Sequence, residues 1–223
     1  MAALVLDFGG VISRTLFETH AMTEAALDLP AGSLTWQGPF LPESDSLWCA
    51  MQADEISERE YWQQRTLEVA ELSGNKWEHM SEFVRAARGA DPEAVVRPEA
   101  LNAIESAHQK GHQLAILSNE LDLFYGKRFR KKLPFLKHFE VIVDATYTGI
   151  LKPDLQAYKQ CIEELGAEAR ECIFVDDQLR NIHGAELAGM QTVHFDVKNP
   201  AASYQTALDL LNNTVNAEPS NYA

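Results

Sequence analysis

Short apolar runs recur along the chain, and each ends at polar or turn-forming residues. The first covers residues 4–6, ends at Asp7 and is followed by Gly9 and Gly10. A short apolar run bounded by turn residues is typical of a strand in the core of a parallel sheet. The same pattern predicts four further strands, at residues 114–117, 141–143, 172–175 and 192–195.

Segments with helical spacing alternate with these runs. They cover residues 98–110, 155–165, 180–188 and 202–211, and residues 124–139 are predicted to be helical or irregular. Pro98 lies near the first turn of its helix, while Gly111, Gly166 and Gly189 stand just past helix ends. Strands separated by helices imply right-handed crossovers. The predicted fold class is therefore α/β, with a doubly wound parallel sheet.

The region after the first strand differs from the rest. It holds all four tryptophans, and residues 21–29 and 57–72 show helical apolar spacing. Ser57 followed by Glu60 predicts a capping box at a helix start. We predict an inserted α-helical domain over residues 14–88, a core over 1–13 and 89–212, and a flexible tail over 213–223. We interpret the tryptophans as the core of the inserted domain rather than a ligand cage.

Composition limits the partners and the compartment. The chain has 223 residues, 46% of them hydrophobic, and a formal net charge of −14. This charge argues against nucleic acid, and we interpret the basic run at 127–132 as a solvated surface. Three scattered cysteines, no signal-peptide pattern and no long apolar stretch predict a cytoplasmic protein without a membrane partner. A monomer and a homodimer are both compatible with the sequence.

Polar residues capable of chemistry stand where several predicted strands end. The set is Asp7, Ser118, Asn119, Asp176 and Asp177, with Lys152 in a loop after another strand. Because the carboxyl ends of parallel strands share one edge, these side chains are expected to converge. The alternative interpretation makes the acids ordinary turn or N-cap residues and Lys152 a surface lysine.

Three converging carboxylates would repel each other, and a divalent cation removes that penalty. Ligands that are all oxygen suit Mg²⁺, which favours phosphate as a further partner. With the metal bound, Asp7 stays ionised and can attack phosphorus to form an aspartyl phosphate. Lys152 and Ser118 then offer donors to the phosphoryl oxygens. The expected substrate is a small phosphorylated metabolite.

Four motifs carry a family resemblance: Asp7-Phe8-Gly9-Gly10-Val11, Ser118-Asn119, Lys152-Pro153-Asp154 and Asp176-Asp177-Gln178-Leu179-Arg180-Asn181. They resemble the motifs of the haloacid dehalogenase-like hydrolases. The resemblance implies Asp7 as nucleophile, Asp176 or Asp177 as metal ligand, and Ser118 and Lys152 as phosphate holders with Asn119 close by. The inserted domain resembles the α-helical C1 cap of that superfamily. Residues 53–57 resemble a cap segment of the branch containing a glucose-1-phosphate phosphatase.

Gly9 departs from the family pattern. Phosphatases of the superfamily usually carry a second Asp there as general acid and base, and that residue gives the metal only its backbone carbonyl, which Gly9 retains. General acid–base help is typically worth about 10²–10⁴-fold. The expected activity is therefore a Mg²⁺-dependent phosphatase with good leaving groups, of which the anomeric oxygen of a sugar phosphate is one.

Two other interpretations stay open. A metal-independent 2-haloacid dehalogenase also lacks the second Asp and uses an Asp nucleophile on carbon, but it has no use for the acids at Asp176 and Asp177. A weakly active or inactive binding protein of the same fold is the other. Arg14, shortly after the nucleophile, is either a partner for a substrate carboxylate or phosphate or a solvated arginine.

Overall fold

The structure is a computed structural model that describes residues 2–88, 93–119, 121–125 and 127–216. The chain forms two compact units. The core unit comprises Met1–Ser13, Val96–Leu121 and Leu133–Ala223, and the helical unit comprises Arg14–Val95 and Asp122–Lys132. The segment Asp122–Lys132, which the sequence pattern assigned to the core, belongs to the helical unit because Phe124 and Tyr125 pack on the apolar cluster of that unit.

The core unit is built on a parallel sheet, as predicted. In the described residues it has five strands: β1 (Ala3–Leu6), β2 (Gln113–Ser118), β3 (Val141–Asp144), β4 (Cys172–Asp176) and β5 (Gln191–His194). Their order is β3-β2-β1-β4-β5, and every neighbouring pair is parallel. The N-terminal strand therefore lies at the centre, and the strand order reverses on either side of it. Such a switch point is where open α/β sheets bind ligands.

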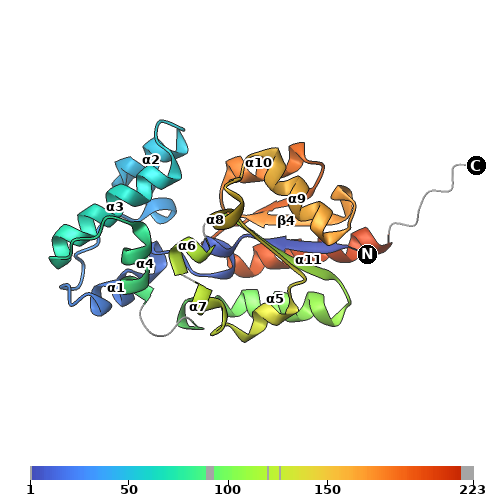
Figure 1. Ribbon diagram of the computed structural model, residues 1–223, viewed down its shortest axis with the longest axis horizontal. Coiled ribbons are helices and arrows are strands. Elements are labelled where there is room, and N and C mark those ends of the chain that lie inside the picture. The colour runs from blue at the N-terminus through green and yellow to red at the C-terminus, as the bar shows by residue number, and fades with distance from the viewer. Residues whose placement is uncertain (1, 89–92, 120, 126, 217–223) are drawn as a thin grey trace, which may run out of the picture. The chain divides into compact units, whose positions relative to one another are not determined.

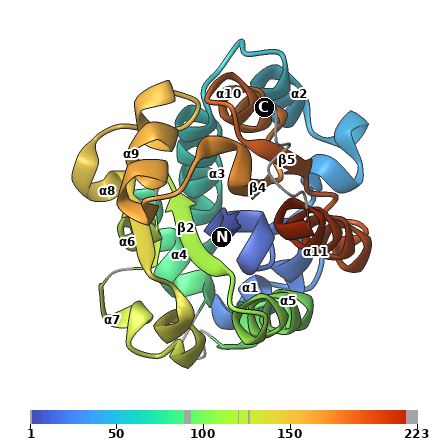
Figure 2. The same ribbon diagram turned by 90° about the vertical axis from the view of Figure 1, so that its right-hand side faces the viewer.

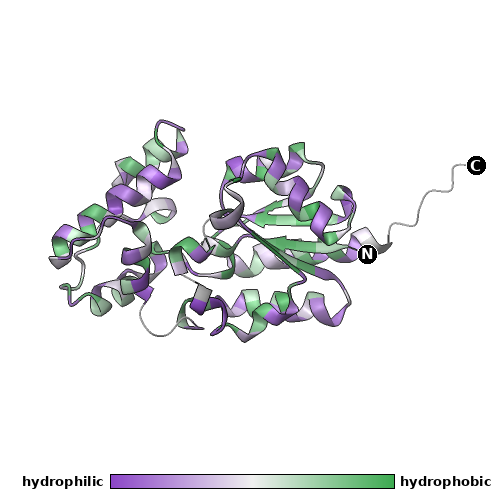
Figure 3. Ribbon diagram, in the orientation of Figure 1, coloured by the Kyte–Doolittle hydropathy of each residue, from purple (hydrophilic) through white to green (hydrophobic). Residues whose placement is uncertain are grey.

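Helices cover both faces of this sheet (Figures 1 and 2). On one face lie α9 (Leu155–Leu165) and α10 (Leu179–Leu187), and on the other α5 (Pro98–Gln109) and α11 (Pro200–Asn216) pack together. The strands are the most uniformly hydrophobic elements of the unit, whereas the helices are hydrophobic on one side (Figure 3). This is the pattern expected of strands buried on both faces.

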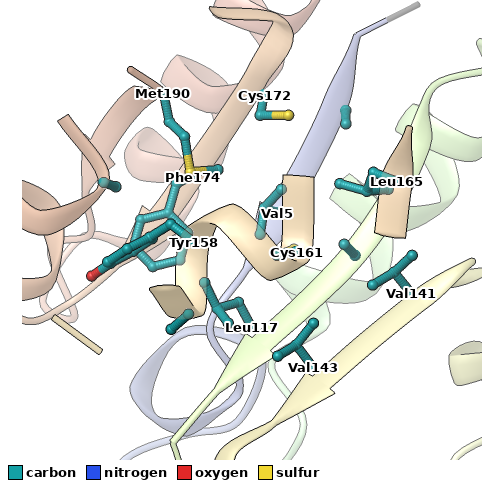
Figure 4. Close-up of a cluster of buried hydrophobic side chains, with 14 of the residues drawn as sticks. Val5, Leu117, Val141, Val143, Tyr158, Cys161, Leu165, Cys172, Phe174 and Met190 are labelled. Atoms are coloured by element: carbon teal, nitrogen blue, oxygen red, sulfur yellow. The ribbon is translucent and has the colours of Figure 1, made fainter. Parts of the chain in front are cut away.

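Alternating residues of the strands fill the core beneath α9 and α10. Val5, Leu117, Val143 and Phe174 pack there with Tyr158, Cys161 and Ile182 of the two helices (Figure 4). The Tyr158 and Phe174 rings meet edge to face, with centroids 5.5 Å apart. Their neighbours Leu4 and Leu6 are fully buried too, and the alternation of side chains along a strand directs them to the opposite face.

Residues 124–139 are helical in part and otherwise irregular, as predicted, whereas the last helix departs from its predicted bounds. The range 124–139 includes the end of α6 (Leu121–Tyr125), the whole of α7 (Lys127–Arg130) and a tight turn at Pro134–His138. Further along the chain, the short helix α8 (Ala145–Thr148) follows β3. The last helix, α11, continues to Asn216 rather than ending at residue 211. In its last turns the side chains of Asn212 and Thr214 donate hydrogen bonds to the carbonyls of Leu208 and Leu210. Residues 217–223 of the predicted tail lie outside the described residues.

The helical unit contains α1 (His20–Ala26), α2 (Ser46–Gln52), α3 (Glu58–Ser73) and α4 (Met80–Arg88). The predicted capping box is present at the start of α3. The Ser57 hydroxyl accepts from the Glu60 backbone N–H, and the Glu60 carboxylate accepts from the Ser57 backbone N–H at 2.7 Å. Nothing in the described parts of the chain forms a helix long and apolar enough to cross a membrane.

The tryptophans pack in the interior of the helical unit, as predicted. Trp36 and Trp48 are buried, and Trp62 and Trp77 are half-buried against the same clusters. Phe17 lies between them, with its ring centroid 5.4 Å from that of Trp36 and 5.3 Å from that of Trp48. These aromatic contacts form the core of the unit.

Candidate active site

Asp7 follows directly after the central strand β1. Its backbone N–H donates to the carbonyl of Val175 at 2.9 Å, which ties the strand end to β4. The turn Phe8–Ile12 follows, and Gly10 within it has a φ of 75°. A Cβ on Gly10 would lie 2.4 Å from Oδ2 of Asp177. Glycine at this position therefore brings the turn after β1 against the carboxylate that follows β4.

Asp176, the last residue of β4, has a carboxylate that the protein itself satisfies. Oδ1 accepts from the Gln178 backbone N–H at 2.8 Å, and Oδ2 accepts from the Lys152 ammonium at 2.6 Å. The amide Nδ2 of Asn181 lies 3.1 Å from both oxygens. Asp176 has no exposed surface. Since a carboxylate offers about four lone-pair sites, this set leaves little acceptor capacity for anything else.

Lys152 joins two of the carboxylates. Its Nζ is 2.9 Å from Oδ1 of Asp7 and 2.6 Å from Oδ2 of Asp176, and its side chain is almost completely buried. The side-chain amide of Asn119 holds the backbone of Lys152 from both sides, accepting from its N–H at 2.7 Å and donating to its carbonyl at 3.2 Å. Lys152 therefore projects into the site from a fixed backbone.

The electrostatics of the site favour added positive charge. Burial raises the pKa of Asp7 to about 7, with the charge of Asp176 acting in the same direction and Lys152 opposing them. Burial alone would lower the pKa of Lys152, but the two carboxylates beside it outweigh burial and raise that pKa above its usual range. Lys152 thus stays charged between the two acids, but its charge does not keep the pKa of Asp7 in the usual range of an aspartate.

The three acids fit a metal ion. Asp7, Asp176 and Asp177 each place one carboxylate oxygen within 4.8 Å of the other two. An all-oxygen donor set of this kind suits Mg²⁺ or another hard divalent cation. A cation there would also lower the pKa of Asp7 by adding the charge that the site lacks. The side chain of Asp177 is half-buried, whereas Asp176 has no surface exposed to solvent.

The structure brings most of the sequence-predicted site residues together. Ser118, at the end of β2, is buried beside the strand that carries Asp7, and Asn119 follows it. Gly9 is exposed, with φ −71° and ψ 129°, which any residue can adopt. Arg14 is half-buried and lies in the helical unit.

Sequence reasoning gave no role to Asn181, although it orients the Asp176 carboxylate. Its backbone carbonyl accepts from the Tyr158 hydroxyl at 2.8 Å, which connects the site to the apolar core. The available signal was the spacing, because Asn181 lies five residues after Asp176, in the first turn of α10. At this spacing the Asn181 side chain lies beside Asp176 at the end of β4.

Together, the fold and this charged cluster are those of a hydrolase built on a Rossmann-like α/β core. The chain belongs to the haloacid dehalogenase-like hydrolase family, whose model matches residues 1–189. All the acids of the cluster, Lys152 and Asn181 fall within that match.

Curated relatives resemble the chain over different lengths. The mouse acyl-CoA dehydrogenase family member 10 is 27% identical over 210 residues, which cover 92% of this chain and 19% of the relative. A phosphatase of Mycobacterium tuberculosis is 29% identical over 99 residues, 44% of this chain and 46% of the relative. The chain thus spans less than half the length of each of these proteins.

Solved structures share the fold at low sequence identity. A HAD-hydrolase of Bacillus subtilis, solved with bound magnesium, superposes with a TM-score of 0.69 at 19% identity, covering 95% of this chain and 98% of that one. The L-2-haloacid dehalogenase of Xanthobacter autotrophicus superposes with a TM-score of 0.57 at 17% identity, covering 87% and 77%. A HAD-hydrolase that binds magnesium and a dehalogenase therefore share this fold, which does not by itself distinguish their chemistry.

Proposed function

We propose that this chain is a Mg²⁺-dependent phosphatase of small phosphorylated metabolites, sugar phosphates foremost, acting through an aspartyl phosphate on Asp7. The observation that carries the proposal is the cluster of Asp7, Asp176 and Asp177, in which Lys152 joins the first two. A dehalogenase that works without metal needs one carboxylate nucleophile. Two additional acids beside it would raise its pKa and weaken it. The phosphatase of Mycobacterium tuberculosis among the relatives supports the same choice.

Asp7 and Asp177 are the side chains we assign to the metal, together with the backbone carbonyl of Gly9. Asp176 has its oxygens taken up by Lys152, Asn181 and Gln178, so we assign it chiefly to holding Lys152. When bound, Mg²⁺ supplies positive charge that keeps Asp7 ionised and offsets the charge of the phosphate.

In the first step a carboxylate oxygen of Asp7 attacks phosphorus, and the bond from phosphorus to the ester oxygen breaks. The Lys152 ammonium and the Ser118 hydroxyl donate to the phosphoryl oxygens as negative charge spreads over them. Asn119 acts by holding the Lys152 backbone. Water then hydrolyses the aspartyl phosphate, which releases inorganic phosphate and restores Asp7.

Gly9 supports the choice of substrate class. The leaving oxygen departs with the bonding electrons and takes its proton from water, because Gly9 has no side chain to give one. Esters with a stable leaving group depend least on that proton, and the anomeric oxygen of a sugar 1-phosphate is such a group. The helical unit, which we propose as the cap, would select among such esters, and Arg14 is a candidate to bind their anionic groups.

A phosphate-release screen tests the proposal. The chain is incubated with sugar phosphates, nucleotides and small phosphoesters, once with Mg²⁺ and once with EDTA. We expect release from at least one sugar phosphate with Mg²⁺ and none with EDTA. Turnover that ignores EDTA contradicts the proposal, and so does a screen in which no phosphoester turns over.

The same samples distinguish the other two interpretations. Chloride release from L-2-chloropropionate in EDTA would identify a dehalogenase. Binding of Mg²⁺ or phosphate by calorimetry without any turnover would identify a binding protein. Asp7→Asn abolishes turnover in both enzymatic interpretations, so it serves as the blank and not as the discriminating variant.

A further inference from the structure

The helical unit contains two buried arginines with opposite surroundings. Arg65 and Arg88 each have 8% of their surface exposed. Arg65 has two acidic partners: its Nη2 lies 2.6 Å from Oδ1 of Asp45, and its Nη1 pairs with Glu68. The Arg65 charge is therefore compensated, although its Nε is buried without a hydrogen-bond partner. Tyr61 adds a 2.8 Å hydrogen bond to the same Asp45.

Arg88, at the end of α4, has no carboxylate partner among the residues that the structure describes. Its Nη2 donates to the backbone carbonyl of Arg14 at 2.7 Å. Its Nε and Nη1 are buried and without a hydrogen-bond partner. The ring of Tyr125 lies 6.0 Å from its Cζ, which offsets only part of the cost. Of the five N–H donors of a guanidinium, the structure thus pairs one.

A buried cation in this condition is costly, because both desolvation and unsatisfied donors disfavour it. The chain is not short of partners, since it has 33 acidic residues against 19 basic ones. Nε and Nη1 lie on different edges of the guanidinium, and each edge is shared with Nη2. The edge that holds the second N–H of Nη2 offers two parallel donors, which match the oxygens of a carboxylate or phosphate group. Arg14, whose carbonyl Arg88 binds, also has a guanidinium with no ion pair to any described residue.

We propose that Arg88 forms an anion-binding site in the helical unit, built from none of the residues of the Asp7 cluster, that accepts a phosphate or carboxylate group of a small molecule. The group is either part of the substrate or belongs to a free anion. The site does not depend on the phosphatase assignment, because the contacts that define it all lie within the helical unit.

The first test compares two matched variants of the full chain, Arg88→Met and Arg65→Met, in chloride buffer with EDTA. Both remove a guanidinium of the same burial. Arg65→Met leaves the buried Asp45 carboxylate without a positive charge beside it, although the hydrogen bonds from Tyr61 and the Trp48 backbone remain. We therefore expect its Tm to fall by on the order of 10 °C. Arg88→Met removes an uncompensated charge, so we expect its Tm to stay within about 2 °C of wild type or to rise. A fall as large as that of Arg65→Met overturns the proposal.

The second test adds inorganic phosphate or malonate at constant ionic strength. Because all four tryptophans lie in the helical unit, their fluorescence reports on that unit alone. We expect saturable changes in fluorescence and a rise in Tm for the wild type and for Asp177→Asn. In Arg88→Met the fluorescence change should disappear. A wild type that does not respond, or an Arg88→Met variant that responds in full, overturns the proposal.

A kinetic comparison then identifies the source of the anion. If it belongs to the substrate, Arg88→Met raises KM at least ~10-fold for phosphoesters with a second anionic group and leaves their neutral counterparts unchanged. If the anion is free, malonate, added with the free Mg²⁺ concentration held constant, changes turnover of both substrate types in the wild type and of neither type in Arg88→Met. Failure of the phosphatase proposal removes this comparison and leaves the two binding tests standing.

Discussion

The ammonium of Lys152 lies 2.6 Å from Oδ2 of Asp176, a carboxylate with no exposed surface, and this contact fixes the lysine beside Asp7. Replacing Lys152 with Met removes the positive charge between two buried acids. We expect at least about a 10²-fold loss of phosphate release, and a loss of about 3–5 kcal/mol in the free energy of unfolding. Activity assays and urea unfolding measure the two effects.

Lys159→Met is the matched control, because Lys159 is exposed on the neighbouring helix α9. It should leave both quantities unchanged. A Lys152→Met variant that stays fully active would show that Lys152 takes no part in the reaction.

Gly9→Asp tests the account of the missing proton donor. The backbone at Gly9 suits any residue, and a Cβ there would meet nothing closer than Oδ2 of Asp7 at 3.9 Å. The new carboxyl could protonate the leaving oxygen, so we expect hydrolysis of esters with poor leaving groups to rise by about 10-fold or more. Esters with good leaving groups should gain little.

The control for this variant is Gly9→Asn, which has the same size but no acidic proton. Initial rates over a series of leaving groups separate the two variants. Equal rates for both, or slower hydrolysis of poor leaving groups in Gly9→Asp, would contradict the role given to Gly9.

Much of the core unit could be predicted from local pattern. The strand ends at Asp7, Ser118 and Asp176 were found because apolar runs stop there, and a parallel sheet brings such ends to one edge. The helix 155–165 agrees with its predicted bounds because Gly166 ends it in the left-handed conformation. The capping box at Ser57 is likewise a local signal, with both partners in one turn.

Contacts between distant residues could not be predicted in this way. Asn119 and Lys152 are 33 residues apart, and nothing in either segment shows that one holds the backbone of the other. The pairing of Asp45 with Arg65, 20 residues away, is of the same kind. The unpaired state of Arg88 is still harder to predict, because it depends on which of the described residues lie around it in three dimensions, and none of them offers it a carboxylate.

Gly10→Ala should weaken metal binding. Its Cβ would lie 2.4 Å from Oδ2 of Asp177, so the carboxylate must move, and φ of 75° adds a cost of about 1 kcal/mol. We expect Mg²⁺ affinity, measured by titrating phosphate release, to fall at least about 10-fold. Gly111→Ala has φ of 76° and no atom within 4 Å of the new Cβ, so it should lose stability only. Equal Mg²⁺ titrations for the two variants would remove Asp177 from the metal site.

The stability of the helical unit should depend on pH through Glu24. Its carboxylate accepts from the backbone N–H groups of Leu34 and Gly32 at 2.9 and 3.0 Å, and the Leu34 bond is the main cause of its lowered pKa. A carboxyl with a lowered pKa stabilises the fold above its unfolded pKa, near 4.5, and this contribution is lost as the pH falls through the folded pKa.

Glu24→Gln keeps one acceptor and turns an NH₂ group toward a backbone N–H, so we expect it to cost about 1–3 kcal/mol at pH 7. The difference from wild type should stay constant down to about pH 5 and shrink below that, as the wild-type carboxylate becomes protonated. Urea unfolding followed by tryptophan fluorescence, at pH values from about 3 to 7, measures it. Glu71→Gln, at an exposed position of α3, should match the wild type throughout. A Glu24→Gln deficit that grows toward acid pH would contradict the lowered pKa, because only a carboxyl that stabilises the fold when ionised loses its contribution on protonation.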